Sequence, residues 1–273
     1  MKLYHYTTLD SFAKIWVSKQ LKFSPPQNTN DLFERSKPVS MICLPNLNTQ
    51  EEDITDLFFF FFYSYGKILH RFKQISLVRD YKDCLGCLSP LMWGQYAHND
   101  QGVCIELDSK ALKWTKNLFH SKVFYKKALP PIKLNRPVTN DVKDIRKFIV
   151  DNRNLFFFMK HKHWEHENEY RIVSDTMDYL SIQGAVTKIY VSNHNHINTK
   201  VVECLVNNEV AIDYLNVRQF IDKKDLTIGD LRSLRKTEKL LAEEPDYYNK
   251  DKVRARFKEK YKITLNNDTR DKS

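Results

Sequence analysis

The chain of 273 residues is poor in glycine, with only six, and contains no glycine-rich phosphate-binding loop. Such loops need glycines at fixed spacing, because the backbone must come close to the phosphate groups of the nucleotide. Long apolar runs are also missing. The longest, residues 57–63, is much shorter than the roughly 20 apolar residues that a membrane-spanning helix needs. We therefore expect neither a Rossmann or P-loop nucleotide enzyme nor an integral membrane protein.

Cysteine is limited to five residues, and the chain opens with MKLYHYTTLD, which lacks the apolar segment of a secretory signal. An odd number of cysteines without such a signal favours reduced thiols and a cytoplasmic location. Cys84 and Cys87 form a C-x-x-C pair, but a zinc site needs a second pair of ligands. We interpret the pair as part of a strand over residues 84–89 whose side chains pack in the core.

Basic side chains outnumber acidic ones by 44 to 34, which gives a formal net charge of +10. A surplus of this size favours encounter with polyanions through long-range attraction. A nucleic acid, a nucleotide or a protein that binds nucleic acid is therefore an expected partner, and no membrane partner is expected.

Helical and strand patterns intermix along the chain without the regular strand–helix–strand rhythm of a parallel sheet. This mixture predicts an α+β fold, with mixed, mainly antiparallel sheets flanked by helices. We expect one domain over residues 1–221 and a charged helical extension over residues 222–273, where Pro245 separates two helical segments. The predicted strands are 3–6, 21–24, 84–89, 103–107, 123–126, 169–174 and 186–191, and the predicted helices are 9–18, 51–79, 90–97, 110–119 and 141–162.

Two of the segments suited to chemistry lie in the first half of the chain. At the end of the first strand, His5 lies near the hydroxyl of Thr7 and can donate a hydrogen bond to a ligand; the alternative is a partly buried structural histidine. Trp93 and Tyr96 lie three residues apart on a predicted helix. Their rings present a flat apolar face that either stacks on a planar ligand or packs in the core.

A third segment carries two glutamates two positions apart, Glu167 and Glu169, which face the same side of an extended chain. Two adjacent carboxylates repel each other and destabilise the fold unless they take part in function or pair with a cation. Arg171 faces that side too. An ion pair between Arg171 and either glutamate is therefore the alternative to a catalytic role.

Most of the chain resembles an uncharacterised bacterial family, domain of unknown function 2971. The matching features, in chain order, are the His5-Tyr6-Thr7 opening, the loop with Asn30-Asp31 and Phe33-Glu34, the helix with Met92-Trp93 and Tyr96-Ala97, the pair Gly102-Val103, and residues Trp164 to Arg171. This resemblance by itself implies no activity.

A more distant resemblance, to the His-Tyr-Glu branch of the ADP-ribosyltransferase superfamily, does imply an activity. In that superfamily a strand ends in His-Gly-Ser or a similar triplet, a helix carries a ring-stacking Tyr, and a later strand bears the catalytic Glu. Here His5-Tyr6-Thr7, Tyr96 and Asn168-Glu169-Tyr170 are similar to these three motifs. Tyr6 stands where Gly is usual, and the second motif lacks the usual Gly-Tyr pair.

This second resemblance implies NAD⁺ as the substrate and ADP-ribose as the transferred group. Glu169 is then the catalytic carboxylate, which stabilises an oxocarbenium-like transition state and holds the 2′-hydroxyl. Tyr96 stacks on nicotinamide, and His5 hydrogen-bonds the adenosine-side ribose. The resemblance also suggests a toxin or phage-defence effector that modifies a nucleic acid or a protein. The further contacts to NAD that it implies come from Tyr6, Thr7, Ser89, Trp93, Glu167 and Arg171.

Two other functions stay open at this point. His161, His163 and His166, with the nearby glutamates, are residues that a metal-dependent hydrolase or nuclease uses, although no known metal-site spacing fits them. The other alternative is a catalytically inactive module that keeps the fold and binds a nucleotide or nucleic acid. Our leading hypothesis, the NAD-dependent transferase, needs no metal.

Overall fold

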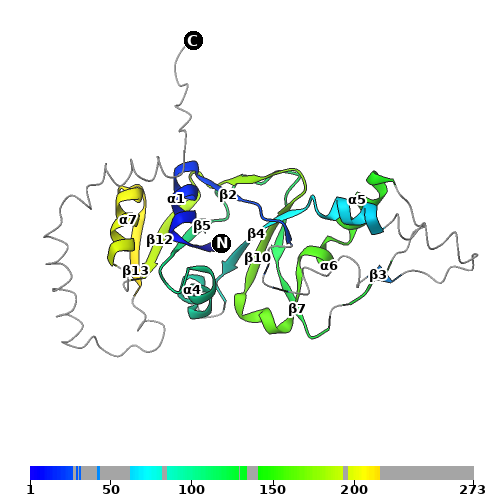
Figure 1. The fold of residues 1–273 in the computed structure, drawn as a ribbon, viewed down its shortest axis with the longest axis horizontal. Coiled ribbons are helices and arrows are strands. Elements are labelled where there is room, and N and C mark those ends of the chain that lie inside the picture. Colours follow the sequence, from blue (N-terminus) through cyan, green and yellow to red (C-terminus); the bar gives the residue numbers. More distant parts are fainter. Residues whose placement is uncertain are drawn as a thin grey trace, which may run out of the picture. The chain divides into compact units, whose positions relative to one another are not determined.

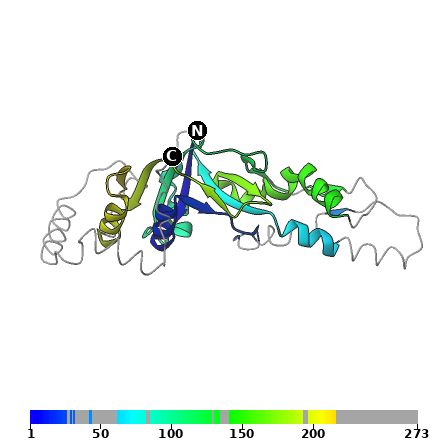
Figure 2. The same ribbon diagram turned by 90° about the horizontal axis from the view of Figure 1, so that it is seen from above.

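A computed structural model describes residues 1–26, 29, 31, 42–43, 62–81, 85–128, 130–133, 141–192 and 196–215. The chain divides into two compact units, the first formed by residues 1–20, 79–112 and 181–273 and the second by residues 21–78 and 113–180. Each unit combines helices with mainly antiparallel strands (Figures 1 and 2), which confirms the predicted α+β class. The expected extension over residues 222–273, and the boundary before it, lie outside the described residues.

In the first unit, four strands follow the order β13-β12-β5-β1, in which β5 is antiparallel to both of its neighbours and β13 is parallel to β12. Helices α1 and α7 contact each other beside this sheet. The strands are β1 (Lys2–Thr7), β5 (Val103–Asp108), β12 (Val186–Ser192) and β13 (Ala211–Leu215). The helices are α1 (Leu9–Ser18), the 3-10 helix η2 (Gly86–Leu88), α4 (Pro90–Tyr96) and α7 (His196–Val206).

The boundaries of α1 and α4 follow from their capping residues. The backbone N–H of Ser11 donates to the hydroxyl of Thr8 at 3.3 Å, and this N-cap fixes the beginning of α1. Ser89 caps α4 in the same way, and Pro90 occupies its first turn, where a missing N–H costs nothing. Both helices were expected from the sequence, and the structure confirms them.

In the second unit, β10 lies between β4 and β6 and is antiparallel to both. Three further pairs of short strands accompany this sheet: β7 with β9 and β3 with β8, both parallel, and β2 with β11. The strands are β2 (Gln20–Lys22), β3 (Ile42–Cys43), β4 (Lys73–Arg79), β6 (Phe119–Lys122), β7 (Phe124–Lys126), β8 (Ile132–Lys133), β9 (Met159–His161), β10 (Glu169–Ser174) and β11 (Tyr179–Ser181). The helices are residues 62–69, α5 (Val142–Asp151), α6 (Arg153–Phe157) and the 3-10 helix η3 (Lys162–Glu167).

The core of the second unit is built largely from aromatic rings. Phe72 stacks on Phe157 with ring centroids 5.0 Å apart, and Tyr65 contacts both Phe148 and Phe156. Tyr65 comes from the helix over residues 62–69, Phe72 from the segment just before β4, and the other rings from α5 and α6. Of the phenylalanine run over residues 58–62, which we expect to form a buried helix, only Phe62 is described, and it is partly buried against this core.

Four predicted elements were wrong in type or extent. Residues 73–79 form β4 rather than the end of a long helix, because β-branched Ile75 and its neighbours pair with β10. Residues 110–119 are not helical, and residues 86–88 form η2 rather than part of a strand. The long helix over 141–162 is interrupted at Asn152, whose side-chain amide donates to the carbonyl of Phe148 at 2.9 Å and closes α5.

Among the described residues no helix is long and apolar enough to span a bilayer.

Candidate functional site

Glu169 is the first residue of β10, the central strand of the second unit's three-stranded sheet. The preceding Asn168 adopts a left-handed conformation with φ 42° and ends η3, so the chain turns sharply just before the glutamate. Asparagine tolerates this conformation better than most residues. The backbone N–H of Glu169 donates to the phenol oxygen of Tyr125 at 2.9 Å. The turn and this hydrogen bond fix where β10 begins and which way the Glu169 side chain points.

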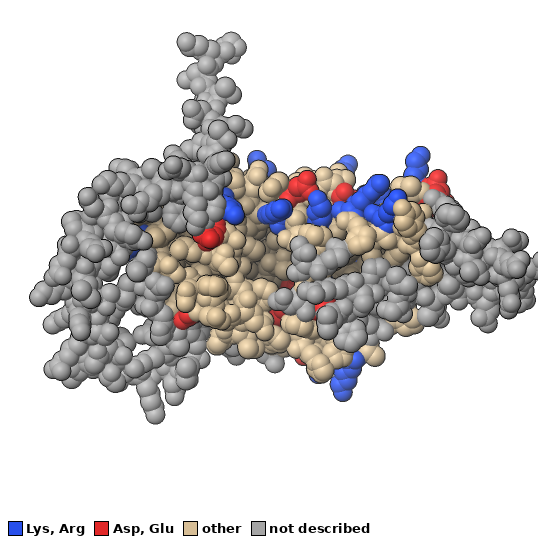
Figure 3. All heavy atoms as spheres, viewed as in Figure 1, with Lys and Arg blue, Asp and Glu red and all other residues tan. Residues whose placement is uncertain are grey.

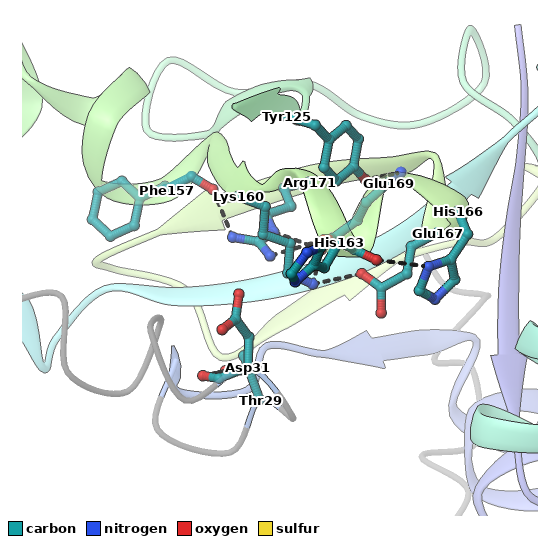
Figure 4. A network of polar contacts seen from close by, with 10 residues as sticks. All are labelled: Thr29, Asp31, Tyr125, Phe157, Lys160, His163, His166, Glu167, Glu169 and Arg171. Atoms are coloured by element: carbon teal, nitrogen blue, oxygen red, sulfur yellow. Dashed lines mark hydrogen bonds and ion pairs between the residues drawn. The ribbon is translucent and has the colours of Figure 1, made fainter. Parts of the chain in front are cut away.

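Four charged side chains, Lys160, Glu167, Glu169 and Arg171, form what we call the charge cluster (Figure 4). Arg171 grips the Glu169 carboxylate with two hydrogen bonds, from Nε at 2.5 Å and from Nη2 at 2.8 Å. The Lys160 ammonium lies 2.5 Å from Glu167 Oε2 and 3.2 Å from Glu169 Oε2. All four residues are buried, with Arg171 only 1% exposed. The predicted pairing of Arg171 with a glutamate is therefore confirmed for Glu169.

The charge cluster contains two cations and two anions, so its formal charge cancels. Burial alone would raise the pKa of Glu169, but the adjacent Arg171 and Lys160 outweigh it and hold that pKa at about 2. Glu169 is thus ionised at any physiological pH. Burial also raises the pKa of the Tyr125 phenol, which stays protonated. The ionised carboxylate lies next to the surface, because the exposed Ser76, opposite Arg171 in register, hydrogen-bonds it.

The histidines considered as metal ligands lie around η3. The rings of His161 and His163 are 4.4 Å apart, and His166 hydrogen-bonds the backbone carbonyl of His163 at 3.1 Å. In the described part of the chain, no three His, Cys, Asp or Glu side chains are grouped so as to hold a metal ion. The hypothesis of a metal-dependent hydrolase therefore gains no ligand set from these residues.

A second group of predicted site residues lies in the first unit, on β1. Side chains alternate along a strand, so His5 and Thr7 share one face and Tyr6 points to the other. The Tyr6 hydroxyl donates to the carbonyl of Gly86 at 2.6 Å. A Cβ atom at Gly86 would lie 2.4 Å from the ring of Tyr4, so only glycine fits there. Tyr6 stands where the ADP-ribosyltransferase motif usually has Gly. Its side chain therefore does not occupy the face of β1 that carries His5 and Thr7.

The residues predicted on α4 divide between core and surface. Trp93 is 2% exposed, meets Tyr6 edge-to-face with ring centroids 5.4 Å apart, and donates its indole N–H to the carbonyl of Cys87 at 2.8 Å. Tyr96, the last residue of α4, is only half-buried. Burial raises the pKa of the Cys87 thiol to about 11, so this cysteine is protonated and packs as an apolar group.

The structure thus brings the predicted residues together as two groups. Tyr6, Ser89 and Trp93 join around η2 and α4 in the first unit, where His5 and Thr7 share the other face of β1. Glu167, Glu169 and Arg171 join in the second unit. Of the loop expected at residues 30–34, Asp31 is described and buried, and its backbone carbonyl accepts a hydrogen bond from Thr29 at 3.5 Å. The remaining residues of that loop lie outside the described ranges.

Two members of the buried polar networks were not anticipated from the sequence. Lys160 belongs to the charge cluster, and the only local signal for its burial is the apolar run Phe156–Met159 that precedes it. In the first unit, Glu106 is 2% exposed and accepts hydrogen bonds from Tyr190 at 2.7 Å and Thr187 at 2.8 Å. Its signal is a lone glutamate inside the otherwise apolar strand β5.

These features define an α+β protein that keeps an ionised, buried carboxylate at the beginning of a sheet strand. Residues 92–172 match the family described as "Protein of unknown function (DUF2971)". The family resemblance expected from the sequence is therefore supported over this stretch, which runs from α4 into β10 and includes Tyr96, Glu169 and Arg171. No curated protein matches the chain.

Proposed function

We propose that the protein is an NAD-dependent ADP-ribosyltransferase in which Glu169 is the catalytic carboxylate. The observation that carries the proposal is the position of this glutamate. It is the first residue of β10, directly after the left-handed Asn168, and its low pKa keeps it charged. The distant resemblance to the His-Tyr-Glu branch assigns the catalytic carboxylate to this same position, in the segment Asn168-Glu169-Tyr170.

In the proposed reaction the bond between nicotinamide and the ribose carbon breaks, and nicotinamide leaves with the bonding electrons. Positive charge then develops on the ribose, and a fixed carboxylate stabilises it most when it is already ionised and oriented. Arg171 and Lys160 supply that ionisation and orientation. The acceptor forms the new bond to the ribose carbon and releases a proton.

The distant resemblance also assigns roles to residues of the first and second motifs. His5, assisted by Thr7, hydrogen-bonds the adenosine-side ribose, and the half-buried Tyr96 stacks on nicotinamide. Tyr6 and Trp93 support His5 and Tyr96 from the core of the same unit, because their polar atoms already bond backbone carbonyls. The acceptor under this proposal is a nucleic acid or a protein, in keeping with the net charge of +10.

A second candidate function is favoured by one observation on Glu169. Both of its carboxylate oxygens contact cations, and the residue is only 4% exposed. A carboxylate engaged in this way suits a structural ion pair in a module that binds a nucleotide or nucleic acid without turnover. The two functions differ in one measurable respect, which is release of nicotinamide.

The test incubates the purified full-length chain with NAD⁺ labelled in the adenylate part, together with a cell extract, and follows nicotinamide release and label transfer. We expect turnover by the wild-type protein and its loss in Glu169→Gln, with circular dichroism showing an intact fold. Asp213→Asn, which changes a carboxylate in a surface ion pair with Lys188, is the matched control and keeps full activity.

Four further readings complete the test. Full turnover by Glu169→Gln would remove the glutamate from catalysis. NAD⁺ binding without nicotinamide release by the wild-type protein would select the second candidate instead. Under either function, His5→Ala weakens NAD⁺ binding by calorimetry, and an unchanged dissociation constant excludes His5 from the site. A toxin or phage-defence role predicts that induced expression in a bacterial host arrests growth, and that Glu169→Gln relieves the arrest.

A further inference from the structure

A row of rings and ammonium groups lies on one face of the second unit's sheet, and we call it the ring-and-lysine surface. Trp114 stacks on His120 with ring centroids 4.0 Å apart, and His120 Nδ1 lies 2.7 Å from the hydroxyl of Tyr170. Lys122 stands directly opposite Tyr170 in register, and its ammonium lies 5.3 Å from the ring of Phe124. The five side chains therefore follow one another along this face, with Lys122 placed beside Tyr170 by the register of β6 and β10.

This series is held on a rigid support at the end of the sheet. Strand β6, which carries His120 and Lys122, is the last strand in the order β4-β10-β6. Tyr170 projects from β10 on the face opposite to Glu169 and Arg171, because side chains alternate along a strand. The surface is exposed rather than buried, with His120 and Lys122 both exposed and Phe124 40% exposed. Desolvation of the ring lowers the pKa of His120, so the ring is neutral at pH 7.

The charge around this surface is positive. Residues 113–128 contain five basic side chains and no acidic one. All five are exposed lysines of the second unit: Lys113, Lys116, Lys122, Lys126 and Lys127. Two aspartates that follow β10 are already paired, Asp175 with Arg146 and Asp178 with Lys73. Figure 3 shows Lys and Arg side chains along the upper border of one face of the molecule, with Asp and Glu side chains among them.

We propose that the ring-and-lysine surface binds single-stranded nucleic acid, with bases against its rings and phosphates against its lysines. Proteins that bind single-stranded nucleic acid combine exposed aromatic rings with positively charged groups. Each base can stack on a ring, and each phosphate can contact an ammonium group. In a duplex the bases are stacked on one another inside the helix, so they are not available to stack on the rings of the protein. An acidic protein would use the lysines but not the rings. The binding does not depend on the proposed transferase activity.

The test measures fluorescence anisotropy of labelled 12-nucleotide single strands, one of DNA and one of RNA, with the full-length protein. Trp114→Ala removes one ring and weakens binding by about 5- to 150-fold, the range expected for one stacked base. Lys113→Glu/Lys116→Glu/Lys122→Glu weakens binding further. It also lowers the slope of log affinity against log salt by about 2, since three phosphate contacts are lost.

Lys200→Glu, a charge reversal on the exposed face of α7 in the first unit, is the matched control and leaves affinity within about twofold at 0.15 M salt. The comparison of the DNA and RNA strands shows which polymer is the better ligand. Four outcomes would overturn the proposal: no binding of either strand, equal losses in Lys200→Glu and the triple variant, duplex binding as tight as single-strand binding, or no effect of both Trp114→Ala and His120→Ala in variants that melt like the wild type.

Discussion

Glu106 in the first unit and Glu169 in the second are both buried carboxylates, but different groups hold their charge. Glu106 accepts hydrogen bonds from the hydroxyls of Tyr190 and Thr187, and its cation, Lys2, has a side chain that is 55% exposed. Glu169 is held by two cations that are themselves buried, Arg171 and Lys160. Burial raises the pKa of both acids, and these partners more than reverse the effect.

The difference bears on what each network contributes. Neutral hydroxyls lose less hydration on burial than ammonium or guanidinium groups, so the network of Glu106 costs less to form. A buried ion pair often gives no more stability than well-packed apolar residues of the same volume. Stability alone therefore does not account for the charge cluster, and this favours a functional role for Glu169.

The largest effect is expected from removing the main partner of Glu169. Arg171→Met leaves the charge cluster with two anions and one cation in a buried place, and we expect it to destabilise the protein by about 3–5 kcal/mol in urea unfolding. Lys188→Met, which breaks a surface ion pair with Asp213, is the control and costs less than about 1 kcal/mol. The double variant Glu169→Met/Arg171→Met is expected to be more stable than Arg171→Met alone. A double variant that is less stable would contradict this account of the pair.

Acid gives the second largest effect. The folded-state pKa of Glu169, about 2, lies below its ordinary value of 4.5, so the unfolded chain takes up the proton first as the pH falls. The stabilisation is complete above about pH 5 and is lost toward pH 2, by an amount on the order of 3 kcal/mol for a buried group. Urea unfolding at successive pH values measures it. The Glu169→Gln profile is expected to be flatter over this range, and parallel profiles would show that Glu169 has no such pKa.

A smaller effect is expected at Glu106. Tyr190→Phe removes a hydrogen-bond donor from a buried carboxylate, and the loss is about 1–3 kcal/mol. Tyr214→Phe is the matched control, because its hydroxyl donates at 2.7 Å to the carboxylate of Glu203, which is partly exposed and lets water replace the lost donor. We expect the control to stay within about 0.5 kcal/mol of the wild type. Equal losses in the two variants would mean that burial of Glu106 does not matter.

The smallest effect is expected from the exposed cation of the first network. Lys2→Ala removes an ion pair at 3.2 Å whose ammonium is in contact with water, and we expect a loss below about 1 kcal/mol. Of the two variants that remove a cation, Lys2→Ala is therefore expected to cost the least stability and Arg171→Met the most. A large loss of stability in Lys2→Ala, measured by thermal unfolding, would mean that Glu106 depends on its cation as strongly as Glu169 does.

Local signals in the sequence predicted the elements that carry most candidate residues. The predicted helices over residues 9–18 and 90–97 correspond to α1 and α4, and the predicted strand over residues 169–174 has the bounds of β10. The pairing of Glu169 with Arg171 was also within reach, because residues two apart on a strand share a face. These features depend on neighbours only a few positions away.

Features that depend on distant partners were not predictable in this way. Lys160 reaches the charge cluster from β9, across a turn whose shape depends on Asn168. Glu106 meets Tyr190 across a strand pair that joins residues 84 positions apart. The aromatic helical pattern that precedes residues 73–79 predicts a helix there, and only the pairing of this segment with β10 makes it a strand. Tertiary pairing overrides local propensity in such segments.

Strand β10 carries the charge cluster on one side and Tyr170 of the ring-and-lysine surface on the other. Adding or deleting a single residue between Asn168 and Arg171 would exchange the two sides, because the alternation has a period of two. The glutamate would then point toward the rings, and the tyrosine toward the lysine and arginine. Relatives of this protein are therefore expected to keep the length of this segment unchanged.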